Sequence, residues 1–214
     1  MSLTLYFHPL SSYCQKALIG LYELEVPFAK QIVDLRDEAE RAAFQKLWPL
    51  AKFPVLHDKM RDEVVPESSS ILEYVELHYA QGRRLIPREP ERALTCRLRD
   101  AFYDLYVNTP MSKIVTDKLR PADQHDTLGV QSAITQLETA YGIAEDWLQG
   151  QPWAVNDSFT LADCAAAPAL FYADRVLPIG GHAQLAAYFA RLRERPSFAR
   201  VIEEARPYWS LFPG

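Results

Sequence analysis

Cysteine is scarce in this sequence and is not arranged for disulfide or metal chemistry. The chain has three cysteines in 214 residues, Cys14, Cys96 and Cys164, and no two of them have CxxC spacing. Disulfide frameworks and zinc sites need several cysteines, or cysteines and histidines, at short regular spacings. The five histidines are equally scattered and form no HxxxH pair. We therefore expect free thiols in a reducing cytoplasm and no metal site.

Long apolar runs and basic excess are also missing. No stretch of about 18 apolar residues is present, so no membrane span is expected. The first residues lack the basic segment and apolar core of a secretory signal, which favours a cytoplasmic location. The net charge of −5 and the pI near 5.6 argue against nucleic-acid binding. With 49% hydrophobic and 24% charged residues, the composition is that of an ordinary globular protein.

The sequence begins with a strand, a loop and a helix in the segment 3–21. Apolar residues alternate over 3–7, the pattern of a half-buried strand, and Ser11 and Ser12 precede apolar residues at helical spacing. The N-terminus of a helix favours an anion and lowers the pKa of a thiol beside it. Cys14 lies one turn inside this helix. A thiolate at this point is therefore more easily supplied by a ligand than by the chain.

Further alternating and helical patterns complete an α/β unit in the first 80 residues. Two short apolar stretches around the polar turn 58–62 are typical of a β-hairpin. The expected element order is βαβαββα over residues 1–80. The other elements are expected as strands at 28–33, 52–56 and 63–65, a helix at 38–48 and a helix that starts within 66–72.

The character of the sequence changes after the segment 81–92, which is rich in Pro, Arg and Glu and is expected to be a linker. Only helical spacing is found over 93–214, which predicts an all-α domain. Its first helix is expected to continue past a bend at Pro110. Thr160 and Asp163 form a capping box, to which we assign a structural role. Further helices are expected at 128–148, 185–193 and 198–205.

Four motifs occur in order along the chain. They are the segment 6–21, the run Lys52-Phe53-Pro54, the pair Glu67-Ser68 followed by Ile71, and the helix start at 159–163. With these motifs the chain resembles the cytosolic glutathione S-transferase family, as a serine-type bacterial member. The resemblance covers essentially the whole chain. It implies a thioredoxin-like domain followed by an all-helical domain, glutathione as co-substrate, and a homodimer.

The resemblance also implies roles for residues at the start of the chain and in the loop before the hairpin. Ser11 matches the serine whose hydroxyl donates to the glutathione thiolate, with Ser12 as an alternative. Tyr6 is a second alternative, because the tyrosine-type classes of the family use a tyrosine on this strand. Phe53 precedes Pro54, which matches a cis-proline, and the Phe53 backbone would face the peptide part of glutathione.

Charged groups of glutathione would be held by residues further along. Ser68 matches a residue that takes the γ-glutamyl carboxylate at a helix start, and Glu67 would face the amine. Lys52 would approach the glycine carboxylate, and Asp100 would reach the amine across the dimer. Plainer roles are open at the same positions, with Ser11 as a helix cap and Glu67 as a partner of the helix dipole.

Some departures from the family pattern bear on function. Many relatives have Asn-Pro-x-Gly before the cis-proline, whereas this chain has Trp-Pro-Leu-Ala at 48–51. Ser11 and Ser12 fit the motif of the zeta class, the maleylacetoacetate isomerases, but the residues at 13–16 do not, which counts against an isomerase. The cysteine of omega-type oxidoreductases would fall on Ser11, so that class is disfavoured.

The expected function is conjugation of the glutathione thiolate to a hydrophobic electrophile, or reduction of a peroxide. The alternatives are a zeta-like glutathione-dependent isomerase and a binding or regulatory protein without turnover, because some relatives serve as interaction modules. The electrophile pocket is expected to be apolar and aromatic, built from Leu10, residues 103–111, Phe171 and the tail 208–212.

Overall fold

The computed structural model describes residues 2–213, and its N-terminal half contains a four-stranded mixed sheet with strand order β2-β1-β3-β4. Strand β1 is parallel to β2 and antiparallel to β3, which in turn is antiparallel to β4. The observed order is the predicted βαβαββα. The elements are β1 (Leu3–Phe7), α1 (Ser12–Glu23), β2 (Ala29–Ile32), α2 (Glu38–Leu47), β3 (Val55–Asp58), β4 (Glu63–Pro66) and α3 (Ser68–His78).

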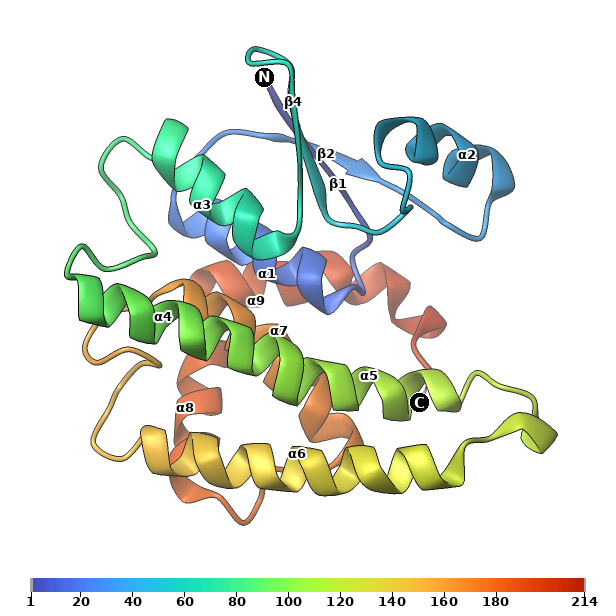
Figure 1. The fold of residues 1–214 in the computed structure, drawn as a ribbon, viewed down its shortest axis with the longest axis vertical. Coiled ribbons are helices and arrows are strands. Elements are labelled where there is room, and N and C mark those ends of the chain that lie inside the picture. The colour runs from blue at the N-terminus through green and yellow to red at the C-terminus, as the bar shows by residue number, and fades with distance from the viewer. Residues whose placement is uncertain (1, 214) are drawn as a thin grey trace.

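The alternation in β1 separates the two faces of the sheet. Leu5 and Phe7 are buried in the main core, which includes the apolar sides of α1 and α3. Tyr6 points to the other face, where its ring stacks on Phe44 of α2 at 5.9 Å between centroids. Two helices thus cover one face of the sheet and α2 covers the other (Figure 1).

The second half of the described chain is helical, so the predicted fold class is confirmed. Its long helices lie below the α/β half in Figure 1, and α1 lies between the sheet and this half, in contact with α7 and α9. The helices are α4 (Pro90–Phe102), α5 (Thr109–Asp117), α6 (Thr127–Trp147), α7 (Leu161–Val176), α8 (Ala183–Glu194) and α9 (Pro196–Ala205), with short 3₁₀ turns at Ala122–Gln124 and Arg206–Leu211.

Three local features differ from the sequence-based expectation. Helix α4 already begins at Pro90, capped by the Glu89 carboxylate, so the segment between α3 and α4 is 79–89 and not the expected 81–92. The long first helix changes at a π-helical turn, Tyr103–Asn108, and continues directly into α5, which contains Pro110. Strand β3 begins only at Val55, after the loop that contains the cis-proline.

The capping box at the start of α7 is present, as predicted. The Asp163 carboxylate accepts the Thr160 amide at 2.7 Å and the Thr160 hydroxyl at 2.8 Å. It also accepts the Tyr188 hydroxyl at 2.7 Å, so it joins α7 to α8. Helix α7 is thereby fixed in the core. Across residues 2–213, no helix is both long and apolar enough to span a membrane.

Candidate functional site

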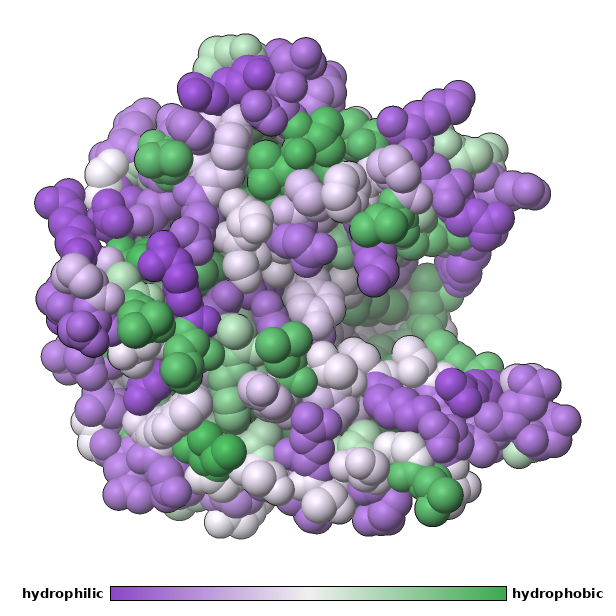
Figure 2. Space-filling view, in the orientation of Figure 1, coloured by the Kyte–Doolittle hydropathy of each residue, from purple (hydrophilic) through white to green (hydrophobic). Residues whose placement is uncertain are grey.

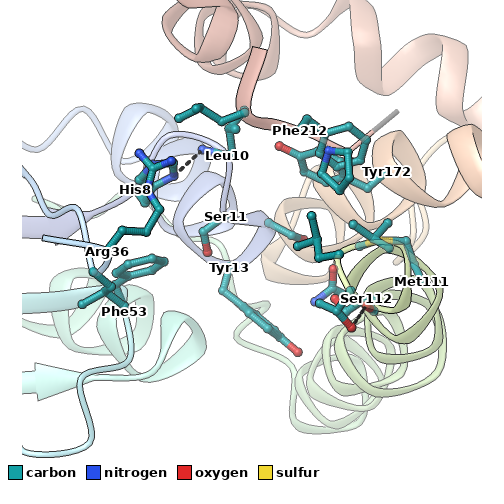
Figure 3. Close-up of a pocket in the computed structure, with 18 of the residues that line it drawn as sticks. His8, Leu10, Ser11, Tyr13, Arg36, Phe53, Met111, Ser112, Tyr172 and Phe212 are labelled. Carbon is teal, nitrogen blue, oxygen red and sulfur yellow. Dashed lines mark hydrogen bonds between the residues drawn. The ribbon is translucent and has the colours of Figure 1, made fainter. Parts of the chain in front are cut away.

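A cavity of about 480 Å³ opens where the N-terminal end of α1 faces the helical half. Figure 2 shows the hollow at the side of the molecule, between the two halves. This volume is within the range of small-molecule sites. In Figure 3, Ser11 lies between His8 and Phe53 on one side and Tyr172 and Phe212 on the other.

Ser11 is both the N-cap of α1 and a wall of this cavity. Its backbone is extended (φ −76°, ψ 121°), and its Oγ accepts the Cys14 amide at 3.4 Å. That bond is long for an N–H···O contact, and the hydroxyl keeps its own proton for a second partner. Ser12, the first residue of α1, also lines the cavity. Both hydroxyls therefore lie at a helix end that favours an anion.

His8 forms the neighbouring wall and was not singled out in the sequence. Its Nδ1 accepts the Leu10 amide at 3.3 Å, so the neutral ring carries its proton on Nε2. The ring stacks on Phe53, with 6.0 Å between centroids, and meets the edge of Tyr208 at 5.9 Å. Burial lowers the His8 pKa, and the neighbouring charges of Asp34 and Arg36 oppose each other. His8 is therefore a neutral, aromatic part of the site at neutral pH.

Two groups near the start of the chain lie outside the cavity. Tyr6 is in the small core between the sheet and α2, and it is not one of the residues that line the cavity. Cys14 is fully buried in the main core. Burial raises the pKa of the Cys14 thiol to about 12, so this thiol stays protonated at neutral pH. Neither group is placed to supply or hold a thiolate in the cavity.

The loop before β3 carries the predicted cis bond, between Phe53 and the buried Pro54. Phe53 lines the cavity, whereas the Lys52 side chain is exposed on the same loop. Arg36, on the loop after β2, also lines the cavity, and its guanidinium donates to the Asp34 carboxylate from Nε at 2.9 Å and from Nη2 at 2.7 Å. One cationic side chain, that of Arg36, therefore lines this side of the cavity, and Lys52 precedes the cavity residue Phe53 in the chain.

The start of α3 lies beyond the cavity, next to α1. Glu67 has φ +66°, a conformation that is uncommon for a residue with a side chain and costs about 1–3 kcal/mol. Its exposed side chain makes no capping bond to α3 within the described chain. Ser68, the first residue of α3, is buried. The two predicted residues thus adjoin each other at a helix N-terminus, outside the cavity lining.

A buried charge cluster joins α1, α3 and α4 beneath this region. Lys16, only 1% exposed, places its Nζ 2.7 Å from Asp100 Oδ1 and 2.6 Å from Asp104 Oδ2. The same ammonium donates to Ser69 Oγ at 2.7 Å, and the Ser69 hydroxyl donates to Asp100 Oδ2 at 2.7 Å. Burial raises the pKa of Asp104 to about 6, although Lys16 acts in the opposite direction.

This cluster changes the interpretation of Asp100. The sequence suggested that its carboxylate reaches glutathione across a dimer, but the side chain is buried and both of its oxygens contact groups of its own chain. We therefore leave Asp100 out of the proposed binding site. The role of Lys16 was not predicted from the sequence. The pattern that could have indicated it is a cation among the buried residues of α1, next to Ala17.

The helical wall of the cavity contains some, but not all, of the residues that the sequence predicted for it. Asn108, Met111 and the tail residues Leu211 and Phe212 line it, as does Leu10. Two other expected residues, Tyr103 and Phe171, are buried in the core. Tyr172 lines the cavity in place of its neighbour Phe171. Its side chain points toward α1, where its hydroxyl accepts a hydrogen bond from the side-chain amide of Gln15 at 2.9 Å.

Comparison with protein families decides the identity of the chain. Residues 5–83 match the description "Glutathione S-transferase, N-terminal domain", and residues 105–196 match "Glutathione S-transferase, C-terminal domain". The chain belongs to the glutathione S-transferase family. The two matches cover most of the chain and correspond to the two halves of the fold.

Individual relatives are distant but nearly full in length. Glutathione S-transferase GstB of Escherichia coli (strain K12) is 25% identical over 94% of this chain and 97% of that protein. A stringent starvation protein A homolog from Haemophilus influenzae is 28% identical over 96% of this chain and 92% of that protein. A glutathione S-transferase from Methylobacillus flagellatus, crystallised with GSH bound, has a TM-score of 0.84 and 25% identity over 94% of this chain and 98% of that chain.

The site of this glutathione S-transferase family member offers hydroxyls, backbone amides and aromatic rings as its chemical groups. Across residues 2–213, no three His, Cys, Asp or Glu side chains are grouped so that they could hold a metal ion. The chemistry that the cavity can provide with its own residues is anion stabilisation at the end of α1, next to an apolar wall.

Proposed function

We propose that this protein is a glutathione transferase that binds glutathione at the start of α1 and transfers its thiolate to a hydrophobic electrophile. The observation that carries the proposal is the position of Ser11. Its hydroxyl lies at the positive end of α1, in a cavity whose opposite wall includes Met111, Val115 and Phe212. One side of the cavity thus suits a sulfur anion and the other suits an apolar reactant.

The catalytic task is to ionise a thiol near neutral pH. A free thiol with a pKa of about 8.5 is only a few per cent ionised there. A hydroxyl donor and a helix N-terminus that lower this pKa by about one to two units stabilise the thiolate by about 1.4–2.8 kcal/mol. The thiolate then forms a carbon–sulfur bond with the electrophile as the leaving group departs with its electron pair.

The peptide part, the γ-glutamyl group and the glycine carboxylate of glutathione would each contact a different segment of the chain. With the sulfur at Ser11, the peptide part would run past the backbone of Phe53. The γ-glutamyl carboxylate would accept hydrogen bonds from the Ser68 hydroxyl and from the backbone amides at the start of α3, and Glu67 would face the amine. The strained backbone of Glu67 supports a functional constraint at this position. Lys52 would approach the glycine carboxylate.

Replacement of Ser68 tests this placement. We expect Ser68→Ala to weaken glutathione binding by about 1–3 kcal/mol, because a charged group of the ligand would lose a hydrogen-bond partner. Isothermal titration calorimetry measures the effect. Ser70→Ala is the matched control, since Ser70 is an exposed serine on the first turn of the same helix and should leave the affinity unchanged. If both variants bind glutathione with the affinity of the parent, Ser68 only begins α3 and does not bind glutathione.

A binding or regulatory protein without turnover is the second candidate, because a stringent starvation protein A homolog is among the relatives of the chain. Two measurements separate the candidates. Calorimetry with glutathione tests the binding site, and turnover of an aryl halide that bears nitro groups tests transfer. Binding with turnover supports the transferase. Binding without turnover of aryl halides, peroxides or a maleylacetoacetate-like substrate supports the binding protein. Absence of glutathione binding contradicts the transferase and leaves the binding or regulatory protein.

The proposed transferase is also expected to be a homodimer of about 49 kDa, twice the 24.4 kDa chain. Leu94, Leu98 and Leu105 are more than half exposed at helical spacing along α4 and the following turn. A second cavity of about 380 Å³, lined by apolar groups such as Phe102 and Trp147, lies between α6 and the end of α4 with its following turn. Exposed apolar surface on these elements supports an interface.

Analytical ultracentrifugation at micromolar concentration tests the dimer. We expect the parent to sediment as a dimer and Leu98→Glu to shift it to the monomer, because a charge would be buried at the centre of the apolar face. Leu128→Glu is the control, because Leu128 is 86% exposed at the first turn of α6. A parent that sediments as a monomer would contradict the proposed assembly.

A further inference from the structure

We infer that Asn108 is a specificity residue of the cavity, which selects electrophiles that carry one hydrogen-bonding oxygen on an otherwise apolar body. This inference deepens the proposed transferase function and rests on it. Asn108 lines the cavity, is 1% exposed, and its Oδ1 has no hydrogen-bond partner within residues 2–213. A buried side-chain carbonyl oxygen without a partner is uncommon and costly in a folded protein.

Two other polar side chains on the helical wall, those of Thr116 and Tyr172, have hydrogen-bond partners within the protein. The Thr116 hydroxyl donates to the Ser112 carbonyl of its own helix at 2.7 Å, and the Tyr172 hydroxyl accepts from Gln15 at 2.9 Å. Asn108 differs from these two residues because its buried Oδ1 has no partner within residues 2–213, although the residue lines the cavity. Sites of this kind typically combine an apolar lining with a few polar groups that orient the ligand.

The backbone fixes the position of Asn108. It is the last residue of the π-helical turn Tyr103–Asn108, a rare conformation that often occurs at functional sites. The Asp104 carbonyl accepts both the Thr109 amide and the Thr109 hydroxyl, the latter at 3.1 Å, which holds the end of this turn. The side chain of Asn108 therefore enters the cavity wall from a well-anchored segment.

The amide can meet either kind of partner. A half-turn of the terminal group exchanges oxygen and nitrogen, so Asn108 can accept or donate. A carbonyl or nitro oxygen on the electrophile would accept a hydrogen bond from the N–H of the Asn108 side-chain amide. A hydrocarbon group of the same shape would leave the amide buried without a partner, and the site would discriminate against it.

Binding of reaction products tests this inference without turnover. The probes are glutathione S-conjugates with an acetylbenzyl group and their isopropylbenzyl counterparts, each in the ortho, meta and para forms. The acetyl and isopropyl groups have similar shapes, but only the acetyl group has an oxygen. We expect the parent protein to bind the acetyl conjugate about five to ten times more tightly for at least one ring position. Calorimetry gives each dissociation constant.

Asn108→Leu keeps the approximate volume and removes the amide, so we expect it to abolish this preference. Thr116→Val is the matched control, because the Thr116 hydroxyl is already bonded within its helix and its loss should change both affinities by the same factor. Asn108→Ala provides the same comparison if the leucine variant does not fold.

The outcomes separate this inference from the proposed function. If the parent binds glutathione but shows no preference for the acetyl conjugate at any ring position, the role of Asn108 is wrong and the transferase proposal stands. A preference that survives in Asn108→Leu and Asn108→Ala also overturns it. If the parent binds neither glutathione nor any conjugate, the proposed function fails, and the inference fails with it.

Discussion

Lys16→Met is expected to lower the free energy of unfolding by about 3–5 kcal/mol at neutral pH. The Lys16 ammonium is buried and lies within 2.7 Å of Asp100, Asp104 and Ser69. Methionine has a similar length but no charge, so the substitution would leave two carboxylates in the interior without their cation. Buried carboxylates that lose their cation destabilise a protein by far more than the net value of the intact cluster.

Asp104→Asn is the matched variant with the opposite expectation. Burial raises the pKa of Asp104 to about 6, so the native carboxyl holds its proton over a pH range in which the unfolded chain has lost it. The stabilising contribution of this carboxyl is therefore present at acidic pH and is lost as the pH rises through about 6. Asparagine does not ionise. Asp104→Asn should match the parent near pH 4 and become the more stable of the two above about pH 6.

Urea unfolding followed by circular dichroism, repeated between about pH 4 and pH 8, measures both effects. A Lys16→Met variant within about 1 kcal/mol of the parent at neutral pH would show that the cluster does not depend on its cation. A loss of stability in Asp104→Asn that grows with pH would show that the Asp104 carboxylate is favourable when charged.

Much of the fold could be predicted from the sequence because elements such as β1 and α6 bury one face. The alternation at Leu3, Leu5 and Phe7 and the helical spacing after Ser11 are local signals, and the same holds for α6 and the capping box of α7. The π-helical turn at Tyr103–Asn108 was not predicted, because no residue pattern distinguishes an extra residue in one turn from a continuous helix. The sequence instead drew attention to Pro110, which lies within α5.

The candidate site was predictable only where its residues belong to short motifs. Ser11, Phe53 and Pro54 lie in such motifs, and the structure places Ser11 and Phe53 at one cavity. Lys16 and Asp104 are far apart in the chain and meet only when α1 packs against the helical half, so no local pattern could pair them. Tyr6 was a candidate by position on a strand, and its orientation toward α2 became clear only from the structure.

Ser11→Ala is expected to lower turnover at neutral pH by at least about tenfold and to leave glutathione binding nearly intact. The reason is that the Ser11 hydroxyl would donate to the thiolate but not to the thiol, so its loss should raise the pKa of bound glutathione by a unit or more. The variant then needs a higher pH to form the same amount of thiolate. Its rate deficit should shrink as the pH rises, with the whole pH–rate profile moved toward alkaline pH.

A structural role of Ser11 makes a different prediction. If the hydroxyl only caps α1, its loss should cost about 1 kcal/mol of stability and leave turnover unchanged. The 3.4 Å bond to the Cys14 amide is a weak cap, which favours the first expectation. Ultraviolet titration of the thiolate absorbance of bound glutathione, together with urea unfolding, separates the two roles.

Two further variants decide which hydroxyl acts on the sulfur. Ser12 lines the same cavity as Ser11, so Ser12→Ala tests the alternative serine, and we expect it to shift the thiol pKa much less. Tyr6→Phe is the control, because the Tyr6 ring packs against Phe44 on the opposite face of the sheet. A pKa shift in Ser12→Ala alone would move the catalytic role by one residue. A shift in Tyr6→Phe alone would require a tyrosine mechanism, which would need the Tyr6 side chain to leave the core beside α2. With all three variants at the parent pKa, the thiolate would be held by the amides of α1, and the binding-protein function would gain support.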